Sequence, residues 1–170
     1  KFREFIFNLR ERTLTKGMQI LNELQQIFVH LQCSTQKSWN PSAFIKCLNI
    51  PPNQQQDAQE FNKLLLNIVE DTLKKSDVPE IRDFLPKMFQ GEISNTTTCR
   101  ACRYPSERPS KFYELSVQVK GMKRLEDSIE SMLIPEALTG SNKYLCSRCH
   151  CKQDADRQTV LKKLPPVLNI

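Results

Sequence analysis

The chain has 170 residues, of which 39% are hydrophobic and 26% are charged, with a formal net charge of +6. This length suits one domain or part of a larger one, and the hydrophobic content excludes wholesale disorder. Basic and acidic residues are interleaved, so we expect a solvated surface and no nucleic-acid partner. The longest apolar runs are too short to span a bilayer, so we also expect no membrane partner.

The first 75 residues carry a helical pattern. Apolar residues recur at helical spacing over 2–9, 20–31 and 61–73, which predicts three amphipathic helices. In the third, we expect Phe61, Leu64, Leu65, Ile68, Val69 and Leu73 to point inward. Asp57 followed by Glu60 has the spacing of a capping box, so the third helix is predicted to begin at Asp57 or at the next residue.

The pattern changes after about residue 90. The threonines at 96–98 favour a strand, and apolar residues alternate with polar ones over 113–119, which predicts a half-buried strand. Helical spacing returns over 125–133. The turn residues at 140–142 then lead into a short strand that is predicted to end at Cys146.

The last four residues, 167–170, are mostly apolar and resemble a strand cut short. A complete domain seldom ends on an apolar run with no polar tail. We therefore expect the chain to be a piece of a larger domain.

Seven cysteines are present, and an odd number fits a disulfide scaffold poorly. Four of them form two Cys-x-x-Cys pairs: Cys99 with Cys102, and Cys146 with Cys149. In a reducing compartment this spacing indicates metal or redox chemistry. We expect the protein to reside in the cytoplasm, the nucleus or both.

The two pairs together predict one structural zinc ion, because four thiolates complete a closed tetrahedral site. Two separate redox pairs or four buried thiols are the alternatives, although neither pair lies at the strand-to-helix junction that a thioredoxin-like site requires. His150 and Cys151 adjoin the second pair and could replace Cys149 as a ligand. Cys33 and Cys47 lie in apolar helical segments and are predicted to be small core residues.

A run of amides and acids precedes the third helix, from Gln54 to Glu60. Amides offer donors and acceptors together, which suits binding an extended backbone, and Asp57 and Glu60 can both face a cationic partner. On these residues alone, an ordinary capped helix is the simpler interpretation.

The run Gln56-Asp57-Ala58-Gln59-Glu60-Phe61 resembles the Gln-Asp-Ala-x-Glu-Phe box of the ubiquitin-specific proteases. The order of the other motifs also resembles that family: the helix with Leu24, Phe28 and Leu31, then Pro41 and Phe44, the box, the first Cys-x-x-Cys pair, Lys111 to Leu115, Gly140 to Cys149, and Leu164 to Leu168. This ordered similarity covers nearly all of the chain. The run from Ser110 to Leu115 narrows the resemblance to one branch of the family.

The resemblance implies an α+β, papain-like fold with a thumb, a palm and fingers. The chain would be part of the catalytic domain, with a helical thumb portion over 1–87. Residues 88–170 would form fingers that carry a four-cysteine zinc ribbon, together with the start of the palm.

The resemblance also implies that the box helix lines the channel for the C-terminal tail of ubiquitin. The ubiquitin-binding residues would then be Gln55, Asp57, Gln59 and Glu60. The expected partners are ubiquitin and ubiquitinated proteins, and the expected cofactor is one structural zinc ion.

The family cleaves the bond after the last glycine of ubiquitin through a cysteine thioester, and it requires a cysteine box and a histidine box that this sequence lacks. His30 lies on a polar helix face and is predicted to be solvated, and His150 adjoins the zinc pairs. We therefore expect no catalytic residue in these 170 residues and no activity from them alone. One alternative is a catalytically dead ubiquitin-binding scaffold, and another, which the scattered charge disfavours, is a zinc-ribbon nucleic-acid module.

Overall fold

The computed structural model describes residues 1–9, 15–51 and 55–170. The chain forms two compact units, Lys1–Leu85 and Pro86–Ile170. None of the helices in these described ranges is both long enough and apolar enough to cross a membrane.

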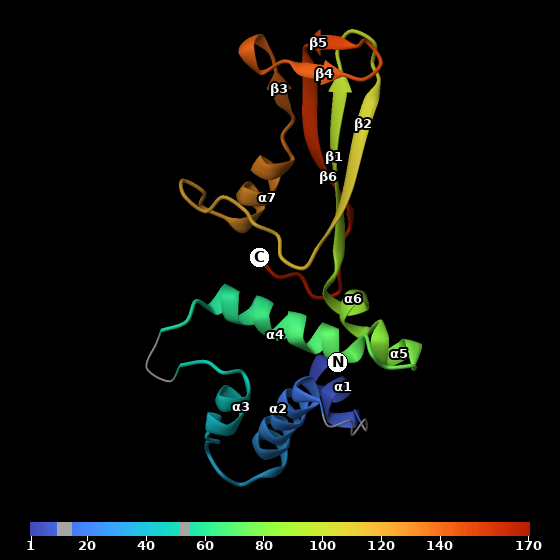
Figure 1. Ribbon diagram of the computed structural model, residues 1–170. Coiled ribbons are helices and arrows are strands. Elements are labelled where there is room, and N and C mark those ends of the chain that lie inside the picture. Colours follow the sequence, from blue (N-terminus) through green and yellow to red (C-terminus); the bar gives the residue numbers. More distant parts are fainter. Residues whose placement is uncertain (10–14, 52–54) are drawn as a thin grey trace. The chain divides into compact units, whose positions relative to one another are not determined.

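The first unit is helical (Figure 1). Its helices are α1 (Phe2–Asn8), α2 (Lys16–Cys33), α3 (Ser42–Cys47), α4 (Ala58–Leu73) and α5 (Pro79–Arg82), and α6 (Phe84–Phe89) spans the boundary between the units. The three predicted helices are confirmed as α1, α2 and α4. The third begins where the capping box places it, with Asp57 as N-cap.

The core of the first unit lies between α2 and α4. Its buried residues include Ile6, Met18, Ile20, Leu21, Leu24, Leu66, Val69 and Leu73. The inward face predicted for α4 is partly wrong, because Leu64 is 41% exposed whereas Leu66 is buried. Three consecutive leucines allow two phases of the helical pattern, and packing against α2 selects the one that buries Leu66.

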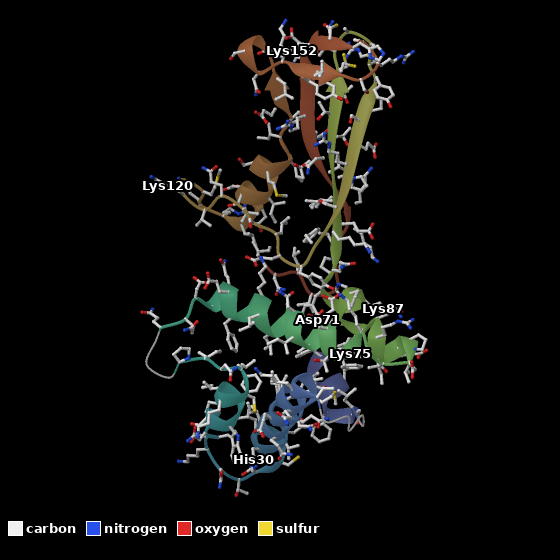
Figure 2. The ribbon with its side chains drawn as sticks, in the orientation of Figure 1. His30, Asp71, Lys75, Lys87, Lys120 and Lys152 are labelled. Atoms are coloured by element: carbon white, nitrogen blue, oxygen red, sulfur yellow. The ribbon has the colours of Figure 1, made fainter. Side chains whose placement is uncertain are left out.

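The C-terminal half of α2 extends beyond this core. Leu31 is 66% exposed, and Cys33 is exposed rather than buried as predicted, while Cys47 is half-buried. His30, which is labelled in Figure 2, is also not simply solvated, because its ring stacks on Trp39 with centroids 3.4 Å apart. The segment after α2 turns back along the helix, and this return covers the His30 ring.

The second unit is built on an antiparallel sheet (Figure 1). Its strands are ordered β2 (Pro105–Phe112), β1 (Gly91–Cys99), β6 (Ala155–Lys163) and β3 (Glu136–Leu138), and α7 (Leu125–Leu133) precedes β3. The predicted strand at 96–98 lies within β1, and the predicted helix at 125–133 is α7. The mixture of helices and antiparallel sheet confirms the predicted α+β class.

A second, two-stranded sheet joins β4 (Tyr144–Cys146) to β5 (Cys151–Gln153), with Cys146 opposite Cys151. A 3₁₀ turn, η1 (Gly140–Asn142), leads into β4. The short strand predicted to end at Cys146 is therefore confirmed.

The strand predicted over 113–119 is wrong, and the chain pairs with β1 over Pro105–Phe112 instead. That segment contains two prolines, and a proline cannot donate a hydrogen bond within a sheet. β2 is an edge strand, so Pro105 and Pro109 can lie opposite Thr98 and Ser94. The alternating residues that follow form no strand, and Val119 is 75% exposed.

The predicted strand at 167–170 is reduced to one parallel bridge between Asn169 and Glu114. The amide of Leu115 donates to the carbonyl of Asn169 over 2.9 Å. Leu115 is buried, which explains part of the apolar pattern that had predicted a strand there.

Candidate functional site

The first Cys-x-x-Cys pair forms a tight turn at the end of β1. The amide of Arg103 donates to the carbonyl of Cys99 over 2.9 Å, and the amide of Cys99 donates to the carbonyl of Tyr104 over 3.1 Å. Arg103 closes the turn in the left-handed region, with φ of 56°. The turn brings the side chains of Cys99 and Cys102 to the same side.

The second pair forms the same turn at the end of β4. The amide of His150 donates to the carbonyl of Cys146 over 2.9 Å, and His150 has φ of 54°. We name these two turns, Cys99–Arg103 and Cys146–His150, the two knuckles. Their shared geometry follows from the shared two-residue spacing between the cysteines.

The knuckles converge on one four-cysteine cluster, made of Cys99, Cys102, Cys146 and Cys149. Their sulfur atoms all lie within 4.8 Å of one another, and the first cysteine of each knuckle is fully buried. The closest sulfur contacts cross between the knuckles, at 3.6 Å for Cys102 with Cys146 and 4.0 Å for Cys99 with Cys149. Tetrahedral zinc with bonds of about 2.3 Å places its sulfurs about 3.8 Å apart. The cluster can therefore hold a metal ion and fits zinc.

This arrangement does not match two separate redox pairs, since each pair meets the other. The pKa values of the thiols also depend on contacts between the two pairs. A hydrogen bond from the amide of Cys149 lowers the pKa of Cys146 to about 7, whereas the neighbouring thiol of Cys102 raises the pKa of Cys149 to about 12. Four thiolates this close repel one another unless a cation neutralises them.

The neighbouring residues that could have replaced Cys149 lie outside the cluster. Cys151 is exposed, and its sulfur accepts a hydrogen bond from Nε2 of Gln153 over 3.1 Å. His150 is exposed and contributes its backbone to the second knuckle.

An anchor that the sequence pattern did not reveal fixes the first knuckle to the strands after the second. The amide of Arg100 donates to the carbonyl of Asp154 over 2.8 Å, and its Nε donates to the carboxylate of Asp156 over 3.1 Å. The Arg100 guanidinium lowers the pKa of Asp156. These residues are more than 50 positions apart, so no local signal marks the pairing.

The predicted cap at the start of α4 is confirmed. The carboxylate of Asp57 accepts hydrogen bonds from the amides of Gln59 and Glu60, over 2.8 and 3.0 Å. No hydrogen bond or ion pair recorded among the described residues uses the Glu60 carboxylate. Only half of the capping box is therefore formed, and Glu60 remains available to a partner.

We name residues Gln55–Glu60 the amide–acid segment, since Gln54 lies outside the described residues. Its candidate binding residues Gln55, Asp57, Gln59 and Glu60 are all exposed. The segment borders a hollow of about 710 Å³ lined mainly by apolar residues: Ile27, Pro41, Ser42, Phe44, Ile45, Lys46, Ile50, Pro51, Gln56 and Phe61. The chain thus presents acidic and amide groups beside an apolar recess.

The rings of His30 and His150 both lie within the described part of the chain. Among the hydrogen bonds of the described ranges, none joins the ring of His30 or His150 to a thiol. His30 is stacked on Trp39, and His150 closes a knuckle.

Comparison with known proteins matches all of residues 1–170 to the ubiquitin carboxyl-terminal hydrolase family. Ubiquitin carboxyl-terminal hydrolase 48 of Gallus gallus is 43% identical over 151 residues, which is 89% of this chain and 15% of the relative. Ubiquitin carboxyl-terminal hydrolase 26 of Oryza sativa subsp. japonica is 39% identical over 99% of this chain and 16% of its own length.

A third relative, ubiquitin carboxyl-terminal hydrolase 34 of Homo sapiens, is 31% identical over 98% of this chain and 5% of its own length. The chain thus spans about 15% of the length of the first relatives. The branch indicated by the run Ser110 to Leu115 is that of ubiquitin carboxyl-terminal hydrolase 48, which the first of these relatives confirms. The chain belongs to the ubiquitin carboxyl-terminal hydrolase family.

Proposed function

We propose that this chain supplies ubiquitin binding and a structural zinc site to a deubiquitinating cysteine protease, which hydrolyses the bonds to the C-terminal glycine of ubiquitin. The proposal rests on one observation: the acids of the amide–acid segment are exposed in a chain that belongs to this family. The helices of the first unit would form the thumb, and the sheet of the second unit would form the fingers and the start of the palm. The protein would act in the cytoplasm, the nucleus or both.

The segment suits a cationic, extended peptide such as the arginine-bearing tail that the family binds. Asp57 and Glu60 lie at the N-terminal end of α4, where the helix dipole stabilises negative charge. A carboxylate accepts several hydrogen bonds, so Asp57 can cap the helix and bind the tail at once. Gln55 and Gln59 add amide groups that can pair with the backbone of the tail.

The test measures ubiquitin binding by calorimetry in the full-length protein. Glu60→Ala should weaken binding by roughly 1–3 kcal/mol, the usual worth of a hydrogen bond to a charged group, without loss of stability. The matched control is Glu80→Ala, because Glu80 is an exposed acid in the first turn of α5. Equal affinities for Glu60→Ala and the wild type would reduce the segment to a plain helix start.

Asp57→Ala should affect both properties. It removes the cap as well as a ligand, so helix stability should fall by about 1 kcal/mol together with ubiquitin affinity. Asp57→Asn keeps a capping oxygen and should retain the stability while losing affinity. If both variants bound ubiquitin normally, Asp57 would have a structural role alone.

We propose zinc as the metal of the four-cysteine cluster. Bound there, zinc would cross-link the knuckles through thiolates and leave no open position for chemistry. Metal analysis of the protein, purified without chelators, should give one zinc per chain. A stoichiometry near zero would contradict the proposal.

A catalytically dead ubiquitin-binding scaffold is the second candidate. It rests on the same exposed acids of the amide–acid segment, which can bind ubiquitin whether or not the full-length protein is a hydrolase. Hydrolysis of a ubiquitin–fluorophore substrate by the full-length protein distinguishes the two, because a scaffold would bind ubiquitin without turnover. These 170 residues alone should show no turnover under either candidate.

A further inference from the structure

A second, polar hollow of about 420 Å³ lies in the second unit. Its lining residues come from β1, β2, β4 and β6: Asn95, Thr97, Ser106, Arg108, Tyr144 and Arg157. Thr97 lies opposite both Ser106 and Arg157, and Asn95 lies opposite Arg108. Because directly opposed residues share a face of an antiparallel sheet, the two arginines project from the same face, one on each side of β1.

The charges of Arg108 and Arg157 are not compensated within the described residues. Their side chains take part in none of the recorded ion pairs or hydrogen bonds. Two other cations of this unit are paired, Arg100 with Asp156 and Lys162 with Glu107. The sheet thus leaves two guanidinium groups unneutralised at one place.

One acid lies near this pair in the strand register. Glu136 of β3 lies opposite Arg157, but no ion pair within 4.0 Å joins the two side chains. Arg108 lies at the other side of β1, on the edge strand, where the register places no acid opposite it. The positive charge of the hollow is therefore local and accessible.

The rest of the lining adds neutral hydrogen-bond donors. Tyr144, Thr97 and Ser106 carry hydroxyl groups, and all three are half-buried. The Oδ1 of Asn95 accepts from the hydroxyl of Thr159 over 3.0 Å, which leaves its Nδ2 group as a donor. Two guanidinium groups surrounded by donors are the chemistry that recognises a carboxylate or a phosphate.

We propose that this hollow binds an oxyanion, the carboxylate or phosphate of an acidic or phosphorylated side chain on a protein partner. The hollow is larger than a single phosphate ion, so it can admit the side chain together with its neighbouring backbone. A protein is the favoured partner, because a nucleic-acid surface requires a longer basic stripe than these two arginines provide. The site is distinct from the amide–acid segment and the four-cysteine cluster, and so extends the proposed function.

The experiment measures anisotropy of labelled peptides with the zinc-loaded full-length protein. The peptides share one Gly-Ser-rich sequence and carry phosphoserine, glutamate or serine at the centre, and a short oligouridine is compared with them. The phosphoserine or the glutamate peptide should bind, and the serine peptide should not. The stronger of the two identifies the oxyanion.

The variants Arg108→Gln and Arg157→Gln keep the length of the side chain and remove its charge. Each should weaken the preferred peptide at least tenfold, and the double variant should abolish binding, while zinc content and ubiquitin affinity stay unchanged. The matched control is Arg124→Gln, because Arg124 is an exposed arginine of the same unit that pairs with Glu126 away from the hollow. It should bind as the wild type does.

Three results would overturn the inference. These are no binding of either acidic peptide at millimolar concentration, equal binding by the hollow variants and the wild type, and tighter binding of the oligouridine with the same dependence on Arg108 and Arg157. If the wild-type full-length protein bound the acidic peptide but not ubiquitin, this would instead count against the proposed function alone.

Discussion

Two residues in left-handed backbone conformation close the knuckles, and neither is a glycine. Arg103 and His150 adopt φ of 56° and 54°. This conformation costs an ordinary L-residue roughly 1–2 kcal/mol, and histidine adopts it more readily than arginine. Each knuckle needs this turn to direct both of its thiols to one point, and the zinc proposed for the cluster would offset the local strain.

Arg103→Gly should strengthen the first knuckle. Glycine relieves the left-handed strain and loses part of that gain to chain entropy, so a net stabilisation of roughly 0.5–1 kcal/mol is expected. Transfer of zinc to a chromogenic chelator should be slower in this variant. Arg103→Val should make the transfer faster, because a β-branched residue tolerates positive φ poorly.

Arg148→Gly is the control for this prediction. Arg148 is an exposed residue of the second knuckle outside the left-handed region, so glycine there adds chain entropy and relieves nothing. Zinc transfer should be slightly faster. Faster transfer in both glycine variants would show that the backbone at Arg103 is not under strain.

The Cys-x-x-Cys spacing was enough to predict the cluster, because the spacing itself sets the turn. The same local logic predicted Asp57 as the cap of α4. The pairing of Arg100 with Asp156 could not be predicted, since it depends on the register between β1 and β6. The two arginines of the polar hollow could not be predicted for the same reason, because only the register of the folded sheet places Arg108 and Arg157 on one face.

At the scale of elements, close packing of α2 against α4 depends on Gly17. A Cβ added at Gly17 would lie 3.0 Å from Cβ and 3.1 Å from Cγ2 of Thr72. The hydroxyl of Thr72 donates to the carbonyl of Ile68 over 2.7 Å, so rotating this side chain away would break that bond. Glycine thus fits this position, although helix propensity favours alanine there.

Gly17→Ala should therefore destabilise the first unit. Alanine gains about 1 kcal/mol of helix propensity, but overpacking typically costs 1–3 kcal/mol, so we expect a net loss of roughly 1 kcal/mol. Hydrogen exchange of the α2 and α4 amides in the full-length protein measures this. Adding Thr72→Ala should recover part of the loss, and Lys16→Ala is the exposed control. Increased protection in Gly17→Ala would mean that the helices separate without cost.

Helices proved easier to predict than strands in this chain. The faces of α1, α2 and α4 follow from local spacing, whereas β2 contains two prolines and few apolar residues. Its position depends on being an edge strand beside β1, which no local pattern reveals. The alternating run at 113–119 has the period of a strand, but its backbone pairing is limited to its first residues, where Glu114 and Leu115 meet Asn169.

At the scale of the whole molecule, the two units are stabilised differently. The first has a buried apolar core between its helices. The part of the second unit that holds the two knuckles, which we call the knuckle end, has two strands of three residues, β4 and β5. Leu145, the middle residue of β4, is 65% exposed and adds little to a core. Such a small sheet is not stable by itself in water. The four-cysteine cluster takes the place of a hydrophobic core there.

Removal of the metal should therefore unfold the knuckle end and spare the first unit. Structural zinc contributes on the order of 10 kcal/mol to the folding of its site, which is comparable with the stability of a whole domain. Exposed trypsin sites lie in this region: Arg100, Arg103, Lys143, Arg148 and Lys152, the last labelled in Figure 2. Limited trypsin digestion of the full-length protein, with the fragments identified by mass spectrometry, should show rapid cleavage at these sites after chelation. The cleavage pattern of Lys1–Leu85 should not change.

Cys99→Ser should give the same pattern without chelator. Cys33→Ser alters an exposed cysteine outside the cluster and should digest as the wild type does. Unchanged cleavage of the knuckle end after complete removal of the metal would show that packing alone holds the two knuckles together.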